Sequence, residues 1–398
     1  HRNIRIFKIF LKSFVFYTGS LRNYELNIIF FFFEDFCGQY DHYLPPDNYQ
    51  EYPPNGAAHR TSPTNIGLLL TSALAARDFG FLTSSDLMER LENTVSTLEQ
   101  MEKWHGHFYN WYHTTNLNIL PPRYVSTVDS GNLLGYLITV SEGLRTLTYG
   151  PDPCYITGLE DTIRLEDEKF LSKFMVYDWK DPAQWGGNLK ENLPSQMRLT
   201  AQRIEAIQKE LQQDQVLLCQ RAAGLAERID RLSDEMDFSM LYDKKQELFS
   251  IGYNIEEERL TRSYYDLLAS EARQTSFMAV ARGEVDKKHW SRLNRSLTML
   301  DHYRGLVSWT GTMFEYLMPL LTMPVYENTL LDETYQFVIY CQKRYGRKRN
   351  VPWGTSESGF YAFDMQLNYQ YKAFGVPELG LKRGLSSEMV VAPYATTM

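Results

Sequence analysis

The chain has 398 residues, enough for one large domain or two ordinary ones. Its 43% hydrophobic and 23% charged residues are typical of a soluble globular protein. The net charge of -8 offers no attraction to a polyanion, which excludes nucleic acid as an expected partner. The aromatic content of 14% fits either a large core or side chains that stack on sugar rings.

The spacing of cysteines and histidines argues against disulfides and metal sites. The cysteines are far apart and form no CxxC pair, as expected of reduced cytosolic thiols: Cys37, Cys154, Cys219 and Cys341. Four histidines have no metal-ligand spacing on a helix: His59, His105, His107 and His113. No P-loop, dinucleotide fingerprint or GxSxG elbow is present, so we expect neither a metal nor a cofactor.

Residues 1–33 differ from the rest of the chain. Residues 4–17 are apolar but contain Lys8 and Lys12, and they are too short and too charged to cross a bilayer. They lack the small-residue cleavage site of a signal peptide. Because the chain begins at His1 and not at Met, we expect a fragment that starts with a membrane-surface segment, an upstream stub or a mistranslated leader.

An irregular segment rich in Pro, Asp, Asn and Tyr occupies residues 34–63. Two helices are predicted to follow, one from Thr64 or Asn65 to Gly80 and one from Ser84 or Ser85 to about Trp104. A long polar and aromatic loop comes next, of the kind that often carries function. Near its end Asp129 is either the N-cap of a helix over Leu133–Leu147 or, with Arg123, a ligand for sugar hydroxyls.

The second half of the chain is also predicted to be helical. Apolar residues at threes and fours predict one long helix from about Pro194 to Met236, as part of a bundle or barrel or as a coiled-coil site. Shorter helices are predicted over residues 263–282, 287–298, 312–321 and 332–344. Strand signals are limited to FSIGYNI at 249–255 and VVAPYA near the end. Helices joined by long aromatic loops indicate an all-α architecture with a loop-built cleft.

Glu357, in VPWGTSESGFYAFD, lies among aromatic, small and hydrogen-bonding residues, which is the setting we look for around a catalytic carboxylate. Trp353 beside Gly354 gives a ring platform with room for a ligand, and Ser356 and Ser358 are able to orient the carboxylate. The alternative is a loop carboxylate that caps the following turn.

Two further glutamates lie on predicted helices. Glu271, in SYYDLLASEARQTSF, shares a largely apolar face with Leu267 and Leu268, where a raised pKa suits a general acid. The alternative is an ordinary ion pair with Arg273 or a neighbouring helix. Glu315, in GTMFEYLMP, is surrounded by apolar residues, so burial requires a partner, and its role is either structural or substrate-shaping.

Several stretches in the same order resemble one family: LPPDNYQEYP, AHRTSPTNIGL, GHFYNWY, LPPRYVSTVDSGNL, SYYDLLASEAR, GTMFEYLMPLL, VPWGTSES, YQYKAFGVPELGLKRGL and VVAPYAT. They are similar to the cyclization domain of bacterial cyclic β-1,2-glucan synthases, a glucoamylase-like region. The resemblance covers residues 34–398 and implies an (α/α)6 barrel. It also implies transglycosylation of linear β-1,2-glucan into a ring, without a cofactor, in a soluble part of a larger synthase. That synthase carries glycosyltransferase and phosphorylase domains at the cytoplasmic face of the inner membrane.

The resemblance assigns Glu271 as acid/base and Glu357 as nucleophile of a retaining mechanism. A water-poor cleft favours a sugar hydroxyl over water as acceptor. The residues expected to bind substrate are Trp111, Tyr112, Arg123, Asp129, Asn132, Tyr265, Asp266, Glu315, Trp353, Ser356, Tyr369, Tyr371, Lys382 and Arg383.

Two departures from the family pattern are present. His113 stands in NWYHT where members typically read NWYDT, which is expected to weaken sugar subsites. The chain stops after APYATTM, where the family continues through further helices, so we expect a barrel incomplete at its C-terminus with exposed core surface. The alternatives are an endo-β-1,2-glucanase of the same fold and an inactive glucan-binding fragment.

Overall fold

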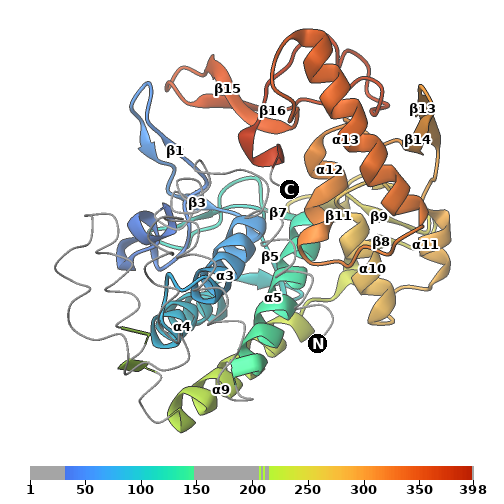
Figure 1. Ribbon diagram of the computed structural model, residues 1–398. Helices are drawn as coiled ribbons and strands as arrows, with labels where there is room; N and C mark the ends of the chain where they lie inside the picture. Colours follow the sequence, from blue (N-terminus) through green and yellow to red (C-terminus); the bar gives the residue numbers. More distant parts are fainter. Residues whose placement is uncertain (1–31, 148–205, 208, 211–214, 397–398) are drawn as a thin grey trace, which may run out of the picture.

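The computed structural model describes residues 32–147, 206–207, 209–210 and 215–396, and the described chain is mainly helical (Figure 1). The α-helices are α3 (Pro63–Asp78), α4 (Ser84–Gln100), α5 (Thr127–Leu147), α9 (Val216–Asp234), α10 (Arg273–Ala281), α11 (Lys288–Arg292), α12 (Met313–Leu317) and α13 (Leu330–Arg349). Short 3-10 turns are η1 (Gln39–Asp41), η4 (Phe238–Leu241), η5 (Met318–Leu321) and η6 (Pro393–Thr396).

The strands are short, and those that pair do so antiparallel. Two sheets have three strands: β11 (Arg259–Leu260), β10 (Gly252–Asn254) and β7 (Tyr124–Ser126), and β12 (Tyr264–Tyr265), β9 (Leu248–Ser250) and β8 (Tyr242–Asp243). The two-stranded pairs are β1 (Tyr49–Gln50) with β2 (Gly56–Ala57), β3 (Arg60–Thr61) with β6 (Tyr112–His113), β4 (Lys103–Trp104) with β5 (His107–Phe108), β13 (Leu297–Leu300) with β14 (Tyr303–Leu306), and β15 (Glu357–Phe363) with β16 (Tyr369–Ala373).

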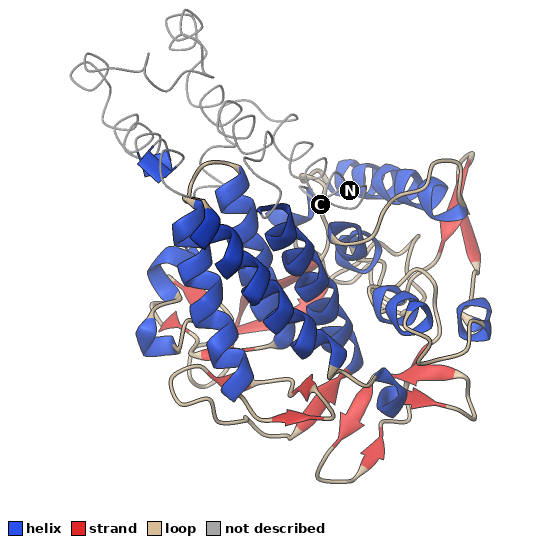
Figure 2. Ribbon diagram, turned by 90° about the horizontal axis from the view of Figure 1, so that it is seen from below, coloured by secondary structure: helices blue, strands red, loops and turns tan. Residues whose placement is uncertain are grey.

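The long helices α3, α4, α5 and α9 pack together around one apolar core, and many of the short strands lie along one side of them (Figure 2). Leu70 of α3, Leu137 of α5 and Ile229 of α9 are fully buried in this core. A second core gathers α12, η5, α13 and the C-terminal segments around Tyr316 and Val338. The segment that carries Glu271 adjoins both cores, since Leu268 and Ala269 belong to the second and Ala279 to the first.

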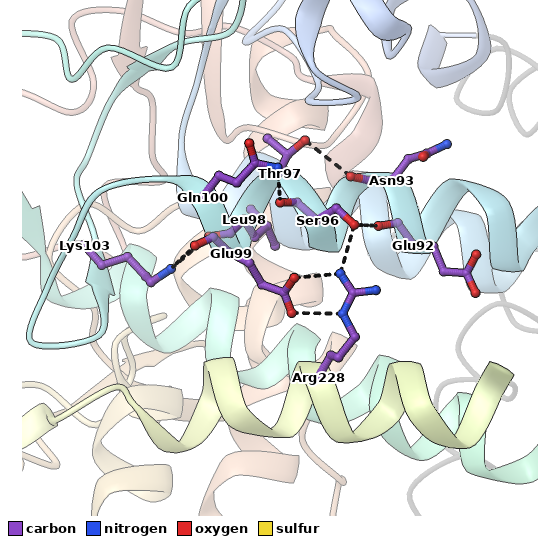
Figure 3. A network of polar contacts seen from close by, with 9 residues as sticks. All are labelled: Glu92, Asn93, Ser96, Thr97, Leu98, Glu99, Gln100, Lys103 and Arg228. Carbon is purple, nitrogen blue, oxygen red and sulfur yellow. Dashed lines mark hydrogen bonds and ion pairs between the residues drawn. The ribbon is translucent and has the colours of Figure 1, made fainter. Parts of the chain in front are cut away.

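Polar contacts also join α4 to α9 at their surface. Arg228 of α9 donates to both carboxylate oxygens of Glu99 on α4, at 2.9 and 2.7 Å, and to Ser96 Oγ at 2.9 Å (Figure 3). The hydrogen bond from Arg228 lowers the pKa of the Glu99 carboxyl. A pair this exposed contributes at most about 1 kcal/mol, so the apolar core dominates the packing of the two helices.

The first helices begin and end near the predicted positions because their signals are local. Ser62 caps α3 through a 3.3 Å hydrogen bond from Asn65 N–H, two residues before the predicted cap, and Gly80 takes a positive φ of 75° just after the helix. Thr83 and Asp86 form a capping box at the start of α4. The helix ends at Gln100, before Trp104, which lies in β4.

Other predicted elements differ from the structure. Helix α5 begins at Thr127 and not Leu133, and the predicted helix over 263–282 is wrong before Arg273, where β12 and a turn stand. The predicted helix over 287–298 is limited to α11, and residues 249–255 form β9 and β10 as expected. VVAPYA is not a strand: Val391 makes an isolated bridge to Thr355, and η6 follows. The helix expected from Pro194 is described from Val216 to Asp234, and its earlier part lies mostly outside the described residues, as do residues 1–31.

Helices α5 and α10 cross at very short distance. A Cβ atom added to Gly131 would lie 1.8 Å from Thr275 Oγ1, and one added to Gly135 would lie 2.1 Å from Gln274 Nε2. The two α10 side chains donate to α5 carbonyls, Thr275 to Thr127 O at 3.2 Å and Gln274 to Gly131 O at 3.1 Å. The start of α5 and the segment that precedes α10 are therefore held together.

Candidate active site

The N-terminus of α5 carries a partly buried acid. Ser126 Oγ accepts a hydrogen bond from the Asp129 backbone N–H at 3.3 Å, so Ser126 caps the helix and the prediction that Asp129 is the cap is wrong. The Asp129 carboxylate instead accepts a hydrogen bond from Thr64 Oγ1 at 2.6 Å. Burial raises the pKa of Asp129, although the hydrogen bonds from Ser126 and Thr64 lower it.

Asn110 links this acid to Trp111. With its amide oriented to satisfy both neighbours, the Asn110 nitrogen donates to Asp129 Oδ2 at 3.1 Å and its oxygen accepts from Trp111 Nε1 at 3.1 Å. The Arg60 guanidinium lies 4.8 Å from the centre of the Trp111 ring. Sequence reasoning missed Asn110 and Thr64 as partners of Asp129, although both lie in the family-like motifs GHFYNWY and AHRTSPTNIGL.

Glu271 lies in the turn between β12 and α10, not on a helix face. Arg273, which follows it, is 1% exposed and donates to the carbonyl oxygens of Tyr316 at 2.7 Å and Ser270 at 3.2 Å. It also donates to the Tyr335 hydroxyl at 3.0 Å. Because these groups occupy the guanidinium, the alternative of an ion pair between Glu271 and Arg273 is wrong.

Glu271 is surrounded by other acids. Burial raises its pKa well above the ordinary value, and the charges of Glu357 and then Asp129 raise it further, against a hydrogen bond from the Asn132 side chain. The pKa of Tyr265 is likewise raised well above its usual value, by burial first and then by Glu271 and Asp129. Three acids, Tyr265 and Asn132 thus lie within electrostatic reach of one another.

Glu357 is the first residue of β15 and is hydrogen-bonded across the hairpin. Tyr371 of β16 donates its hydroxyl to Glu357 Oε2 at 2.7 Å. Tyr371 pairs with Gly359 in the register, so the two side chains are diagonal neighbours on one face. Burial raises the pKa of Glu357, whereas the Tyr371 hydrogen bond and, to a smaller extent, the charge of Lys382 lower it.

A second tyrosine fixes the backbone at Glu357. The Tyr394 hydroxyl of η6 donates to the Glu357 carbonyl oxygen at 2.8 Å and lies 3.0 Å from Ser356 Oγ. Ser356 is fully buried and accepts from Phe314 N–H at 3.1 Å, so it holds the main chain and does not face a ligand. Tyr394 was missed by sequence reasoning because VVAPYA was predicted as a strand.

Glu315 closes a capping box at the start of α12. Its backbone N–H donates to Thr312 Oγ1 at 3.1 Å. Its Oε2 atom accepts from Ser308 Oγ at 2.6 Å and from Gly311 N–H at 2.9 Å. The structure therefore favours the structural interpretation of Glu315.

Tyr112 and Arg123 are engaged in protein contacts. Tyr112 is fully buried in the helical core, where its hydroxyl donates to Glu102 O at 2.7 Å and accepts from Tyr109 N–H at 2.8 Å. The prediction that Tyr112 lines a cleft is wrong for this reason. Arg123 forms an ion pair with Glu102, and its guanidinium lies 5.0 Å from the Tyr109 ring centre.

The remaining predicted binding residues lie nearer the surface. Lys343 Nζ lies 5.3 Å from the half-buried Trp353 ring, and the exposed Tyr369 donates to the Tyr52 carbonyl. His113, which the motif resemblance places where an acid is typical, accepts a hydrogen bond from Thr115 N–H at 3.3 Å. The exposed side chains are those of Asp266, Lys382 and Arg383.

The residues that the structure describes contain neither a cluster of candidate metal ligands nor a membrane-spanning helix. Within these ranges no group of three or more His, Cys, Asp or Glu side chains is placed to hold a metal ion. In the same part of the chain, no helix is long and apolar enough to cross a membrane.

Comparison with known proteins identifies related sequences. Residues 263–398 match the Glycoamylase family, described as "Putative glucoamylase". The chain is 37% identical over 92% of its length to the cyclic beta-(1,2)-glucan synthase NdvB of Rhizobium meliloti. It spans about 15% of that relative's length. These matches confirm the resemblance inferred from the sequence motifs.

Solved structures share the fold at low sequence identity. An endo-beta-1,2-glucanase from Talaromyces funiculosus in complex with sophorose has a TM-score of 0.61 at 10% identity, covering 98% of this chain and 71% of that one. The endo-beta-1,2-glucanase of Chitinophaga pinensis has a TM-score of 0.55 at 14% identity, with 95% and 75% covered. A "putative glucoamylase" from Bacteroides caccae has a TM-score of 0.55 at 16% identity, with 88% and 73% covered. The predicted helical, glucoamylase-like fold agrees with these relatives.

Proposed function

We propose that this chain, as a relative of one segment of a cyclic β-1,2-glucan synthase, acts on linear β-1,2-glucan and closes it into a ring. The observation that carries the proposal is the pair Glu271 and Glu357 in a partly buried site, where burial and then the charge of Glu357 raise the pKa of Glu271. Glycosidases that retain configuration use two such carboxyl groups, one protonated and one ionised.

The two environments support different roles. Glu271 is desolvated, and the charges of Glu357 and Asp129 also raise its pKa, which favours its protonated form and suits a general acid. Glu357 accepts the Tyr371 hydrogen bond and is influenced by Lys382, which favours its ionised form and suits a nucleophile.

The proposed reaction has two steps. The Glu357 carboxylate attacks the anomeric carbon while Glu271 gives its proton to the departing glycosidic oxygen, so the C–O bond breaks and a glycosyl ester forms. A hydroxyl at the other end of the same glucan then attacks this ester and returns its proton to Glu271. The new glycosidic bond closes the ring and frees Glu357.

We propose further that residues 34–398 belong to a domain of the (α/α)6 barrel type with the acid pair in a loop-built cleft, and that residues 1–33 are not part of that domain. The helical fold shared with the glucanases supports the barrel. The share of NdvB that this chain spans supports a place in a larger synthase, for which we propose the cytoplasmic face of the inner membrane.

Hydrolysis is the second candidate function, because the endo-beta-1,2-glucanases share the fold. Incubating the chain with linear β-1,2-glucan separates the two. Rings that resist an exo-acting β-glucosidase are expected from cyclisation, and shortened linear chains from hydrolysis. Glucan binding without any new product would contradict both and indicate a glucan-holding module.

A further inference from the structure

The β15–β16 hairpin carries Glu357 at its base and is held at its tip by a distant residue. Gln50 is 5% exposed. Its amide nitrogen donates to Leu367 O at 2.7 Å and to Pro53 O at 2.9 Å, and its amide oxygen accepts from Tyr369 N–H at 3.0 Å. One buried side chain therefore uses both of its polar atoms to bind Leu367 and Tyr369, which are 317 and 319 positions further along the chain. Leaving such groups unpaired in a buried position is costly.

Neighbouring contacts strengthen the same junction. Asn55 Nδ2 donates to Asn368 Oδ1 at 2.6 Å, and the Tyr369 hydroxyl donates to Tyr52 O. Gln50 itself is fixed by pairing with Gly56 in the β1–β2 hairpin. Figure 1 shows β1 and β15 projecting from the same end of the molecule.

The hairpin tip is internally fixed, so it moves as a unit. Asp364 Oδ1 accepts from the N–H groups of Gln366 and Asn368, each at 2.9 Å, and Asn368 Nδ2 donates to Asp364 Oδ2 at 3.0 Å. A two-stranded hairpin alone is marginally stable in water, so its position depends on such anchors. Tyr371 lies two residues beyond the anchored Tyr369, and a shift of the tip displaces its hydroxyl.

We propose that Gln50 is a positioning residue, which clasps the hairpin tip to residues 49–57 and thereby keeps the Tyr371 hydroxyl on Glu357. The role assigned to Glu357 rests on the proposed function, but the clasp and its effect on the carboxylate do not. Gln50 contacts neither of the proposed catalytic carboxyls and acts through the backbone of β16.

The test is a pH titration of Glu357 in the full chain, monitored by ¹³C NMR with glutamate labelled at the carboxyl carbon. The Glu357 signal is assigned by its loss in the Glu357→Gln variant. Because the Tyr371 hydrogen bond favours the carboxylate, Gln50→Ala is expected to move the Glu357 midpoint to higher pH. Tyr371→Phe removes the hydrogen bond to Glu357 completely, so its shift is the largest that loss of positioning can cause. The other groups that act on Glu357 or feel its charge stay in place in these variants: Glu271, Glu315, Lys382, Tyr265 and Tyr394.

Gln370→Ala is the matched control. Gln370 is an exposed glutamine on the same hairpin, and its amide donates to Asn368 O at 3.4 Å. Its removal is expected to leave the Glu357 midpoint unchanged. Asn55→Ala removes one outer contact of the clasp and is expected to give a smaller shift in the same direction as Gln50→Ala, which keeps the test valid if Gln50→Ala folds poorly.

Two further measurements separate positioning from simple stability. Amide hydrogen exchange at Tyr369 and Tyr371 is expected to accelerate in Gln50→Ala. The value of kcat/KM on β-1,2-glucan is expected to fall by roughly 10-fold to 100-fold, since small remote misplacements cost that much. Faster exchange with an unchanged Glu357 midpoint would overturn the positioning role, and unchanged exchange would overturn the clasp. If wild type leaves β-1,2-glucan unaltered, the proposed function fails, while the titration still decides the inference.

Discussion

The two candidate carboxyls are held by regions of different construction. Glu271 precedes α10, which is pressed against α5 and anchored by the buried Arg273. Glu357 begins a two-stranded hairpin whose tyrosine partner, Tyr371, is 68% exposed. Changes near Glu271 should therefore affect folding stability, whereas changes near Glu357 should affect the site and leave global stability almost unaltered.

The largest expected effect is the same in both regions, because both Glu271 and Glu357 are proposed to be essential for catalysis. Glu271→Gln and Glu357→Gln should each lower kcat on β-1,2-glucan by about 10³-fold, the usual scale for a lost acid, base or nucleophile. Glu258→Gln, at an exposed turn, is the control. Full activity in either active-site variant would rule out the assignment.

Arg273→Leu tests the buried region. It leaves the carbonyls of Tyr316 and Ser270 without their donor, and we expect the free energy of unfolding to fall by about 3 kcal/mol. Urea denaturation measures it. The exposed Arg262→Leu should change stability by less than about 0.5 kcal/mol. Equal effects of the two substitutions would contradict the anchoring role of Arg273.

Tyr371→Phe tests the hairpin region. Loss of the hydrogen bond to Glu357 should raise the pKa of that carboxyl, move the acid limb of kcat/KM to higher pH and lower the maximum about 10-fold. The free energy of unfolding should stay within about 0.5 kcal/mol of wild type. Tyr361→Phe, at an exposed tyrosine of the same hairpin, is the control, and an equal shift there would refute the explanation.

The smallest expected effect is a pH-dependent change in folding stability caused by the buried Glu271. Burial raises the pKa of Glu271 in the folded state, so ionisation of this carboxyl costs stability as pH rises from its unfolded pKa of about 4.3 through its folded-state pKa. Glu271→Gln cannot ionise and should be more stable than wild type by about 1 kcal/mol at pH 7. Denaturation at pH 4 should show little difference, and a gain that persists there would argue against the linkage.

The sequence predicted the elements whose signals are local and continuous. The capped helices α3 and α4 and the helix α13 follow from turn residues and apolar spacing. The segment before Arg273 also has helical spacing, but Leu267 and Leu268 are buried from a turn after β12, where tertiary contacts override periodicity. Strands of two or three residues are too short to show alternation.

The sequence assigned catalytic roles to Glu271 and Glu357 through the resemblance of their motifs to the glucan synthases, and it named Tyr371 only as a substrate-binding residue. Their supporting contacts were beyond it. Gln50 and Thr64 act on residues 319 and 65 positions away, and one polar side chain in a loop carries no sign of such a partner. The burial of Tyr112 was equally hidden, since its neighbours in the chain suggested a surface loop.

The close crossing of α5 and α10 depends on glycines that lack a Cβ atom. It sets the distance between the first turns of α5, with Asp129 and Asn132, and the segment that carries Glu271. Gly131 and Gly135 contribute no side chain, so Thr275 and Gln274 of α10 pack directly against the main chain of α5 and fix the spacing between the acid and the amide. This spacing cannot be relaxed by a rotamer change at a glycine, whereas a methyl group added at position 131 would push the two helices apart. Substitutions at these glycines would therefore change the α5–α10 distance in large steps. Finer changes to the site are best made in the β15–β16 hairpin, around Glu357.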